Sequence, residues 1–315
     1  MDVSVAGGGG ARERAFDPKR PKRMSAEYAR RAMLETAVEL VNEHGLTVSL
    51  QHISLDHISA VAGVARSAVY RIWPTREDFF DELLVKVASK PEYTPSVHDP
   101  ETLITAMRTL KSALQATPDL LATAEMRYAI LVEMCRTGAK INYDNVTLRR
   151  NWRTYIALSA TALSYAEPLR QKLQEAIAQN EASYIAGMAG FYVRVGNIIG
   201  RRVRPEFDAT SEGKEAFANV AATGSALMEG MVLRNITTPE GKNMVPDLTD
   251  DGSRTSDPFG TGNPQPWTAP AIAFAGMFLA MTEPIPDAEY DRTDLDRRLD
   301  EVEQYIAGLP DTTLK

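Results

Sequence analysis

The segment from Ile58 to Phe79, ISAVAGVARSAVYRIWPTREDF, constrains the fold more than any other part of the chain. Gly63 can adopt a positive φ without a Cβ penalty, so the spacing predicts two short helices that reverse direction there. Pro74 cannot continue a helix, and Thr75 with Asp78 three residues later predicts a capped start for the next one. This arrangement is typical of a helix-turn-helix, whose second helix lies in the DNA major groove.

The two short helices are expected to have an apolar side and an exposed side. The apolar side is predicted to hold Ile58, Val61, Ala62, Val64, Ala68 and Ile72. The other side carries arginines and hydroxyls, which bind base edges and phosphate oxygens. We expect base-edge contacts from Arg66, Ser67 and Arg71. Phosphate contacts are expected from Tyr70, Thr75 and Arg76, and the alternative is that this is an ordinary solvated helix face.

The string from Gly63 to Phe79 resembles the DNA-binding domain of TetR-family transcriptional regulators. The helix expected over Ala29 to His44 is similar to the family's first helix, and the resemblance covers about residues 25–88. The chain departs from the family pattern at Ala65, where a serine or threonine usually caps the recognition helix. The run from Leu46 to Leu55 is also longer than the family norm.

The resemblance implies an all-α fold with an N-terminal three-helix helix-turn-helix domain. A larger C-terminal helical bundle would serve ligand binding and dimerisation. The implied function is a DNA-binding transcriptional regulator, a repressor that binds a palindromic double-stranded operator as a homodimer and is released by a small ligand. Residues 101–236 would form the bundle, and 237–315 would be an extension beyond the usual family architecture.

The N-terminus is locally basic on an acidic protein. Residues 12–31 hold eight basic and three acidic side chains, whereas the net charge of the chain is −7. Residues 1–24 are therefore predicted to be a disordered basic arm that assists DNA binding. Its candidate contacts are Lys19, Arg20, Lys22 and Arg23. A solubilising tail is the alternative interpretation.

Beyond a proline-rich break at residues 90–100, the pattern predicts helices almost without interruption. The expected ranges are 101–116, 118–137, 143–166, 168–203 and 212–236, and no strand pair is predicted. In the extension, a long loop is expected to lead into an apolar helix over Ala271 to Met281. A last helix is expected after a cap at Asp294, with Leu295, Leu299, Val302 and Ile306 as its apolar stripe.

The bundle offers candidates for an effector pocket and for a dimer contact. Apolar and aromatic residues that could line a pocket for a small hydrophobic or aromatic effector are Met126, Tyr128, Met134, Trp152, Tyr155, Tyr165, Met188, Phe191 and Tyr192. Small and apolar residues that could form a dimer interface, or pack inside one chain, are Ala221, Gly224, Leu227, Met228 and Met231. The family implies the dimer for this helix, and an ordinary core is the alternative for the pocket set.

Other chemistries find little support. The single cysteine, Cys135, fits a reducing cytoplasm, and His52 and His57 have no partners at zinc-ligand spacing. A phosphate-binding glycine loop and a nucleophile elbow are both missing, so no enzyme, cofactor or metal is predicted. We expect a cytoplasmic protein without a membrane-spanning segment. The alternative function is a DNA-bound interaction scaffold or activator that takes no small-molecule effector.

Overall fold

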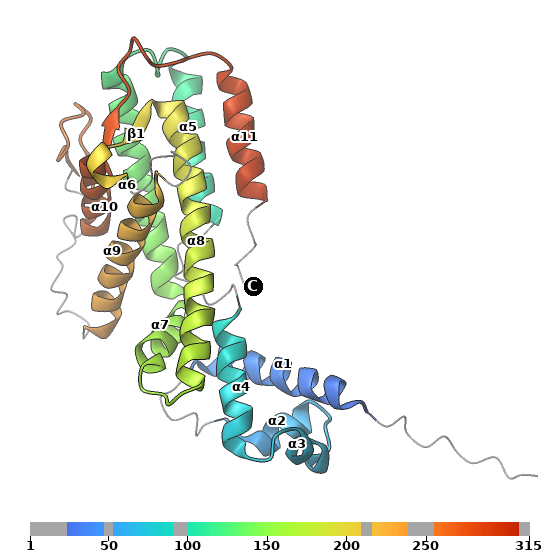
Figure 1. The fold of residues 1–315 in the computed structure, drawn as a ribbon. Coiled ribbons are helices and arrows are strands. Elements are labelled where there is room, and N and C mark those ends of the chain that lie inside the picture. Colours follow the sequence, from blue (N-terminus) through green and yellow to red (C-terminus); the bar gives the residue numbers. More distant parts are fainter. Residues whose placement is uncertain (1–23, 47–52, 91–99, 209–215, 239–254, 309–315) are drawn as a thin grey trace, which may run out of the picture.

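The computed structural model describes residues 24–46, 53–90, 100–208, 216–238 and 255–308. The fold is all-α, as the sequence predicts, because helices make up most of this part of the chain and the strands are few and short. Figure 1 shows an elongated molecule in which a small N-terminal head lies at one end of a longer helical bundle.

The head consists of α1 (Ala26–His44), α2 (Leu55–Val61), α3 (Arg66–Ile72) and α4 (Arg76–Ala88). Ser25 caps α1 by accepting a hydrogen bond from the main-chain N–H of Tyr28, and Gly45 ends the helix at a φ of 79°. The face of α1 that carries Met33, Ala37 and Val41 is buried against the other three helices. An apolar stripe with helical spacing therefore builds the centre of the head.

The bundle contains α5 (Pro100–Ala116), α6 (Ala124–Leu148), α7 (Arg150–Ala162), α8 (Leu169–Ile199), α9 (Ala218–Thr237), α10 (Ala269–Met281) and α11 (Leu295–Ala307), with a short 3-10 turn η2 (Pro205–Phe207). The helix α6 packs between α5 and α10, and α8 packs against α9 and α11. The longest helix, α8, extends from the top of the bundle to the head (Figure 1).

Two helix predictions are wrong at the centre of the chain. The expected break between residues 137 and 143 does not exist, because α6 continues to Leu148, and the next helix is correspondingly shorter. Gly138 lies inside α6, where a Cβ built on it would be 3.8 Å from the Cβ of Ala106 in α5. The glycine therefore lies where α6 packs against α5 and does not mark a break. The helix expected to reach residue 203 ends at Ile199, where Gly200 adopts the left-handed conformation.

The prediction of no strand pairs is also wrong. The strand β1 (Arg201–Val203) pairs antiparallel with β4 (Thr282–Pro284), and β2 (Thr255–Ser256) pairs antiparallel with β3 (Gln265–Pro266). These strands have two or three residues each, so they carry too little alternation to be recognised from sequence.

The C-terminal extension is built into the bundle by a buried arginine. Arg127 of α6 is 1% exposed, and its guanidinium donates to the carbonyls of Leu121 and Ile285 and to Asp287 Oδ1 at 2.8 Å. The same group lies 4.0 Å from the ring centre of Tyr290. The helix expected over Ala271 to Met281 is present as α10, which begins two residues earlier at Ala269. The last helix is present as α11, although the Asp294 side chain makes no capping hydrogen bond.

The hydrophobic core of the head continues into the bundle. It includes Val146 at the end of α6, Trp152 and Leu158 of α7, and Leu173 near the start of α8. The packing unit therefore extends past residue 88, where the sequence places the end of the DNA-binding domain. Helix α8 is thus packed directly on α4 of the head, and α6 contributes Val146 to the same core.

Candidate nucleic-acid interface and bundle cavity

The helix α3 is seated by three apolar residues, and its other side is exposed. Val64, Val69 and Trp73 are at most 4% exposed, so they hold α3 against α1 and α2. The predicted seat was in part wrong, because Ala68 and Ile72 are only half-buried and Val61 of α2 is exposed. All four predicted contact residues on α3 are exposed: Arg66, Ser67, Tyr70 and Arg71.

The exposed side of α3 carries positive charge that is only loosely paired. Arg66 Nε lies 3.4 Å from Asp56 Oδ1, and both side chains are more than half exposed. The Arg66 guanidinium also lies 5.6 Å from the ring centre of Tyr70. An ion pair this exposed contributes little to stability, so Arg66 can exchange Asp56 for a phosphate or a base at small cost.

The turn between α2 and α3 has the geometry that the sequence predicts. Gly63 has a φ of 63°, and no atom would lie within 4 Å of a Cβ built on it. Ala65 occupies the N-cap of α3 without a side-chain hydrogen bond, as its methyl group requires. The first N–H groups of α3 are therefore not capped by this side chain.

The start of α4 uses its polar groups within the chain. Thr75 and Asp78 form a reciprocal capping box, in which the Thr75 N–H donates to Asp78 Oδ2 at 2.9 Å and the Thr75 hydroxyl accepts from the Asp78 N–H at 3.1 Å. Arg76 donates to the carbonyl of Ile53 at 3.4 Å and stacks 4.9 Å from the ring centre of Phe80. A phosphate contact from Thr75 or Arg76 therefore competes with contacts that hold the head together.

A polar network fixes the end of α3 to α1 and α4. The indole Nε1 of Trp73 donates to Glu82 Oε2 at 2.9 Å, and Arg30 of α1 donates to the same carboxylate through two nitrogens. Burial alone would raise the pKa of the Glu82 carboxyl, but the hydrogen bonds from Arg30 and Trp73 outweigh it and hold that pKa below its ordinary value. The predicted arm contacts Lys19, Arg20, Lys22 and Arg23 lie outside the described residues.

A cavity of about 70 Å³ lies inside the bundle, with walls from α5, α6, α8, α9 and α10. Four predicted pocket residues line it, namely Met134, Met188, Phe191 and Tyr192. Five others do not: Met126, Tyr128, Trp152, Tyr155 and Tyr165. Their aromatic and apolar character serves packing elsewhere, since Trp152 and Tyr155 belong to the core shared with the head and Tyr128 donates to the carbonyl of Phe259 at 2.9 Å.

Sequence reasoning missed Asn142, a polar residue in the cavity wall. Asn142 lies on the same face of α6 as Cys135, Gly138 and Ala139, all of which line the cavity. Their spacing of three, four and seven residues is the signal that could have identified this face, but the expected helix break at 137–143 hid it. Burial raises the pKa of the Cys135 thiol to about 12, so the wall presents no thiolate.

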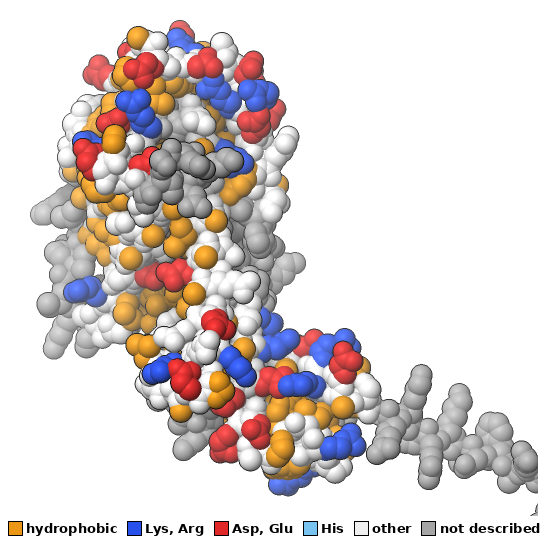
Figure 2. Space-filling model, viewed as in Figure 1, with side chains coloured by type: hydrophobic (Ala, Val, Ile, Leu, Met, Phe, Trp, Pro, Cys, Tyr) orange, Lys and Arg blue, Asp and Glu red, His pale blue; other side chains and the backbone are white. Residues whose placement is uncertain are grey.

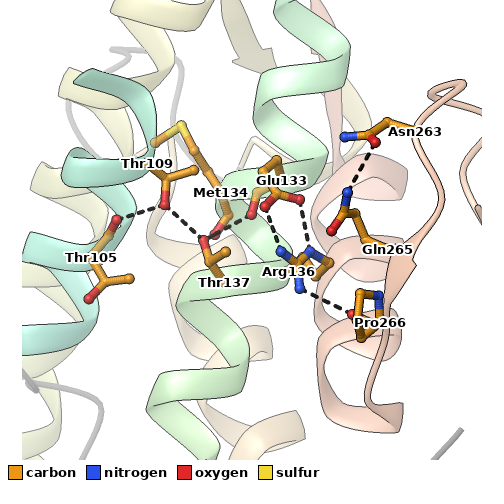
Figure 3. Close-up of polar contacts among 9 residues, drawn as sticks. All are labelled: Thr105, Thr109, Glu133, Met134, Arg136, Thr137, Asn263, Gln265 and Pro266. Carbon is orange, nitrogen blue, oxygen red and sulfur yellow. Dashed lines mark hydrogen bonds and ion pairs between the residues drawn. The ribbon is translucent and has the colours of Figure 1, made fainter. Parts of the chain in front are cut away.

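Polar contacts hold α6 in place on two of its sides (Figure 3). Thr109 Oγ1 of α5 and Thr137 Oγ1 of α6 are 3.2 Å apart. On the other side, Arg136 pairs with Glu133 and donates to the carbonyl of Pro266 in β3 at 3.1 Å. The α6 wall is thus fixed to a helix before it and to a strand from the C-terminal extension.

The five predicted dimer residues do not share one environment. Ala221, Gly224 and Met228 are buried inside the chain, and a Cβ on Gly224 would lie 3.0 Å from the ring of Phe274 in α10. The small size of Gly224 therefore serves the packing of α9 on α10, and the burial of all three residues within one chain corrects their assignment to a surface between copies. Leu227 and Met231 are only partly buried and remain available on the surface of α9.

Within the described ranges, no group of three or more His, Cys, Asp or Glu side chains could hold a metal ion, and no helix is long and apolar enough to cross a membrane. No family model, curated protein or solved structure matches the chain in a comparison with known proteins.

Proposed function

We propose that the protein is a sequence-specific regulator of transcription that binds double-stranded DNA in the cytoplasm and is released by a small ligand. The observation that carries this proposal is the exposed side of α3, which presents Arg66, Ser67, Tyr70 and Arg71. The opposite side of this helix is buried against α1 and α2. A short, rigidly seated helix with arginines and hydroxyls on its free face is suited to the major groove. The helix-turn-helix interpretation of α2 and α3 and membership of the TetR family are parts of the same proposal.

A homodimer is the second part of the proposal. Figure 2 shows that charged side chains gather over the head and the far end of the bundle, whereas the face between them carries fewer charged side chains and more scattered hydrophobic ones. Leu227, Met231 and Leu233 of α9 keep part of their surface exposed, the last at 37%. Apolar surface of this kind supports a contact between two copies. Two α3 helices could then enter successive major grooves of a palindromic operator, with half-site centres ~34 Å apart.

The joint between head and bundle supports the release mechanism. Helices α6 and α8 both line the cavity, and both carry residues of the head's core, Val146 and Leu173. A ligand that changes the packing of these helices would bias the orientation of the head. Release requires that the ligand bind one geometry of the dimer more tightly than the other, since equal affinity shifts nothing.

Selection of genomic DNA fragments by the full chain tests the proposal. We expect one enriched palindromic motif, bound with an affinity that falls steeply as salt rises. Arg66→Ala and Arg71→Ala should each weaken binding to that site by about fivefold or more, the equivalent of ~1–3 kcal/mol. Arg108→Ala removes an exposed arginine of α5 and should leave binding unchanged. Absence of an enriched motif, or equal behaviour of the three variants, would refute the proposal.

A further inference from the structure

We propose that the bundle cavity binds a small apolar molecule that carries one hydrogen-bond donor, of the class of a short-chain alcohol, and that Asn142 Oδ1 accepts from that donor. As the identity of the effector, this inference rests on the proposed function. As a binding site, it rests on three properties of the cavity: its neutral apolar wall, one unsatisfied acceptor, and its size.

The wall excludes a charged ligand. Sixteen residues line the cavity, and none of them is an acid, a lysine, an arginine or a histidine. Apolar side chains such as Leu103, Leu131 and Phe278 form most of it, and the Cys135 thiol stays protonated. A charge brought into this space would lose its hydration and find no counter-charge, so the guest must be neutral.

The acceptor belongs to Asn142, which is 2% exposed. Its Nδ2 donates to Thr102 Oγ1 at 3.4 Å, whereas its Oδ1 is buried and has no hydrogen-bond partner. Both residues line the cavity. A buried acceptor without a partner is unfavourable, so a guest that supplies one donor gains more from this wall than a purely apolar guest does.

The size of the cavity limits the guest. About 70 Å³ is less than half of the ~150 Å³ of a cavity known to hold benzene. Met134, Met188 and Met228 all line it, and the flexible side chain of methionine adapts to guests of different shape. A molecule with a few carbon atoms and one hydroxyl fits these limits better than a large planar effector.

Two isomers of the same formula provide the test. Butan-1-ol and diethyl ether have equal numbers of atoms, but only the alcohol has a donor. We would titrate each into the full chain and follow the methyl NMR signals of Met134, Met188 and Met228, assigned by substitution. We expect saturable shifts, with the alcohol bound at least fivefold more tightly than the ether. Shifts that do not saturate, or equal binding of the two isomers, would overturn the proposal.

Substitutions identify the acceptor. Asn142→Leu keeps the approximate size of the side chain and removes the acceptor, so the preference for the alcohol should disappear. Asn42→Leu is the matched control, because Asn42 also has a buried and unpartnered Oδ1 but lies in α1, away from the cavity. Ala139→Leu fills the cavity and should abolish binding of both isomers. Preserved preference in Asn142→Leu, or preserved binding in Ala139→Leu, would refute the site.

The DNA-binding assay separates this inference from the proposed function. Saturable binding of butan-1-ol that leaves operator affinity unchanged would confirm the site and refute its role in release. Failure to find an operator together with donor-dependent binding would refute the regulator and leave the cavity assignment in place.

Discussion

Asn180 and Ala88 lie 92 positions apart, yet Nδ2 of Asn180 donates a hydrogen bond of 2.6 Å to the carbonyl oxygen of Ala88. The same nitrogen donates to the carbonyl of Lys90 at 3.1 Å. The last carbonyls of a helix have no partner within it, so a side chain from α8 satisfies the C-terminus of α4. This contact, together with the shared core, fixes the head to the longest helix of the bundle.

Asn180→Ala should destabilise the protein at this joint. The substitution removes the donor for two partly buried carbonyls, and we expect a loss of about 1–2 kcal/mol in the free energy of unfolding, measured in urea. Asn219→Ala is the matched control, since Asn219 makes an exposed bond of the same kind to the carbonyl of Phe207. An equal loss in both variants would show that the joint has no special role.

Glu82→Gln should lower the free energy of unfolding at neutral pH, and its effect should be smaller at acidic pH. The pKa of Glu82 is lower in the folded chain than in the unfolded one, so its carboxylate stabilises the fold above the unfolded value of 4.5. That contribution disappears as the pH falls through the folded pKa. We expect a loss of about 1 kcal/mol at pH 7, with a difference from wild type that shrinks toward pH 3.

Urea unfolding across this pH range measures the effect of Glu82. Glu35→Gln, an exposed change on α1, serves as the control and should change stability little at any pH. A Glu82→Gln variant as stable as wild type at pH 7 would contradict the role given to the Trp73–Glu82–Arg30 network.

Gly63→Ala should be destabilising for a reason that lies in the backbone alone. Gly63 has a φ of 63° and open space around its Cβ position, so the only cost is that of a left-handed conformation, ~1–2 kcal/mol. Gly230→Ala provides the opposite case, because Gly230 lies inside α9 with equally open space. There, alanine should stabilise by ~0.5–1 kcal/mol. Thermal unfolding of both variants checks the sign, and a neutral Gly63→Ala would refute the turn.

The sequence predicted the elements of the head better than their contacts. The turn at Gly63, the capping box at Thr75 and the exposed side of α3 follow from local rules, because each depends on residues a few positions apart. The buried face of α3 does not follow from local rules, because packing against α1 and α2 decides which of its residues are covered. Val69 and Trp73, rather than Ala68 and Ile72, are the more deeply buried residues.

The bundle was predicted less well because its site is assembled from distant segments. An apolar helix was expected at the position of α10, but nothing local indicates that Phe274 would close on Gly224 or that Phe278 would line a cavity with Asn142. Small residues in α9 indicate a close contact with another helix, but they do not identify that helix. Intrachain packing on α10 and a contact between copies produce the same pattern in sequence.

Glu229 should make the protein less stable as the pH rises from acid toward neutrality. Its carboxyl lies on α9, where Ser225 Oγ and Glu229 Oε1 are 3.1 Å apart, and burial raises its pKa to about 7, with a further contribution from the charge of Glu181 on α8. Tyr155 of α7 and Tyr184 of α8 also face it and remain neutral, because burial raises the pKa of both hydroxyls.

The direction of the Glu229 effect follows from proton counting. In the unfolded chain this group ionises near pH 4.5, whereas in the folded chain it keeps its proton to about pH 7. Between these values the folded state binds more protons, so the free energy of unfolding falls with rising pH and then levels off. The total change is at most about 3 kcal/mol, and contact of the half-buried side chain with water reduces it.

Glu229→Gln should remove this dependence of stability on pH, and the variant should be more stable than wild type at pH 8, as measured by urea unfolding at several pH values. Glu181→Gln, the exposed neighbour, should only lower the pH at which the slope ends; an unchanged slope in Glu229→Gln would show that the titrating group is another one.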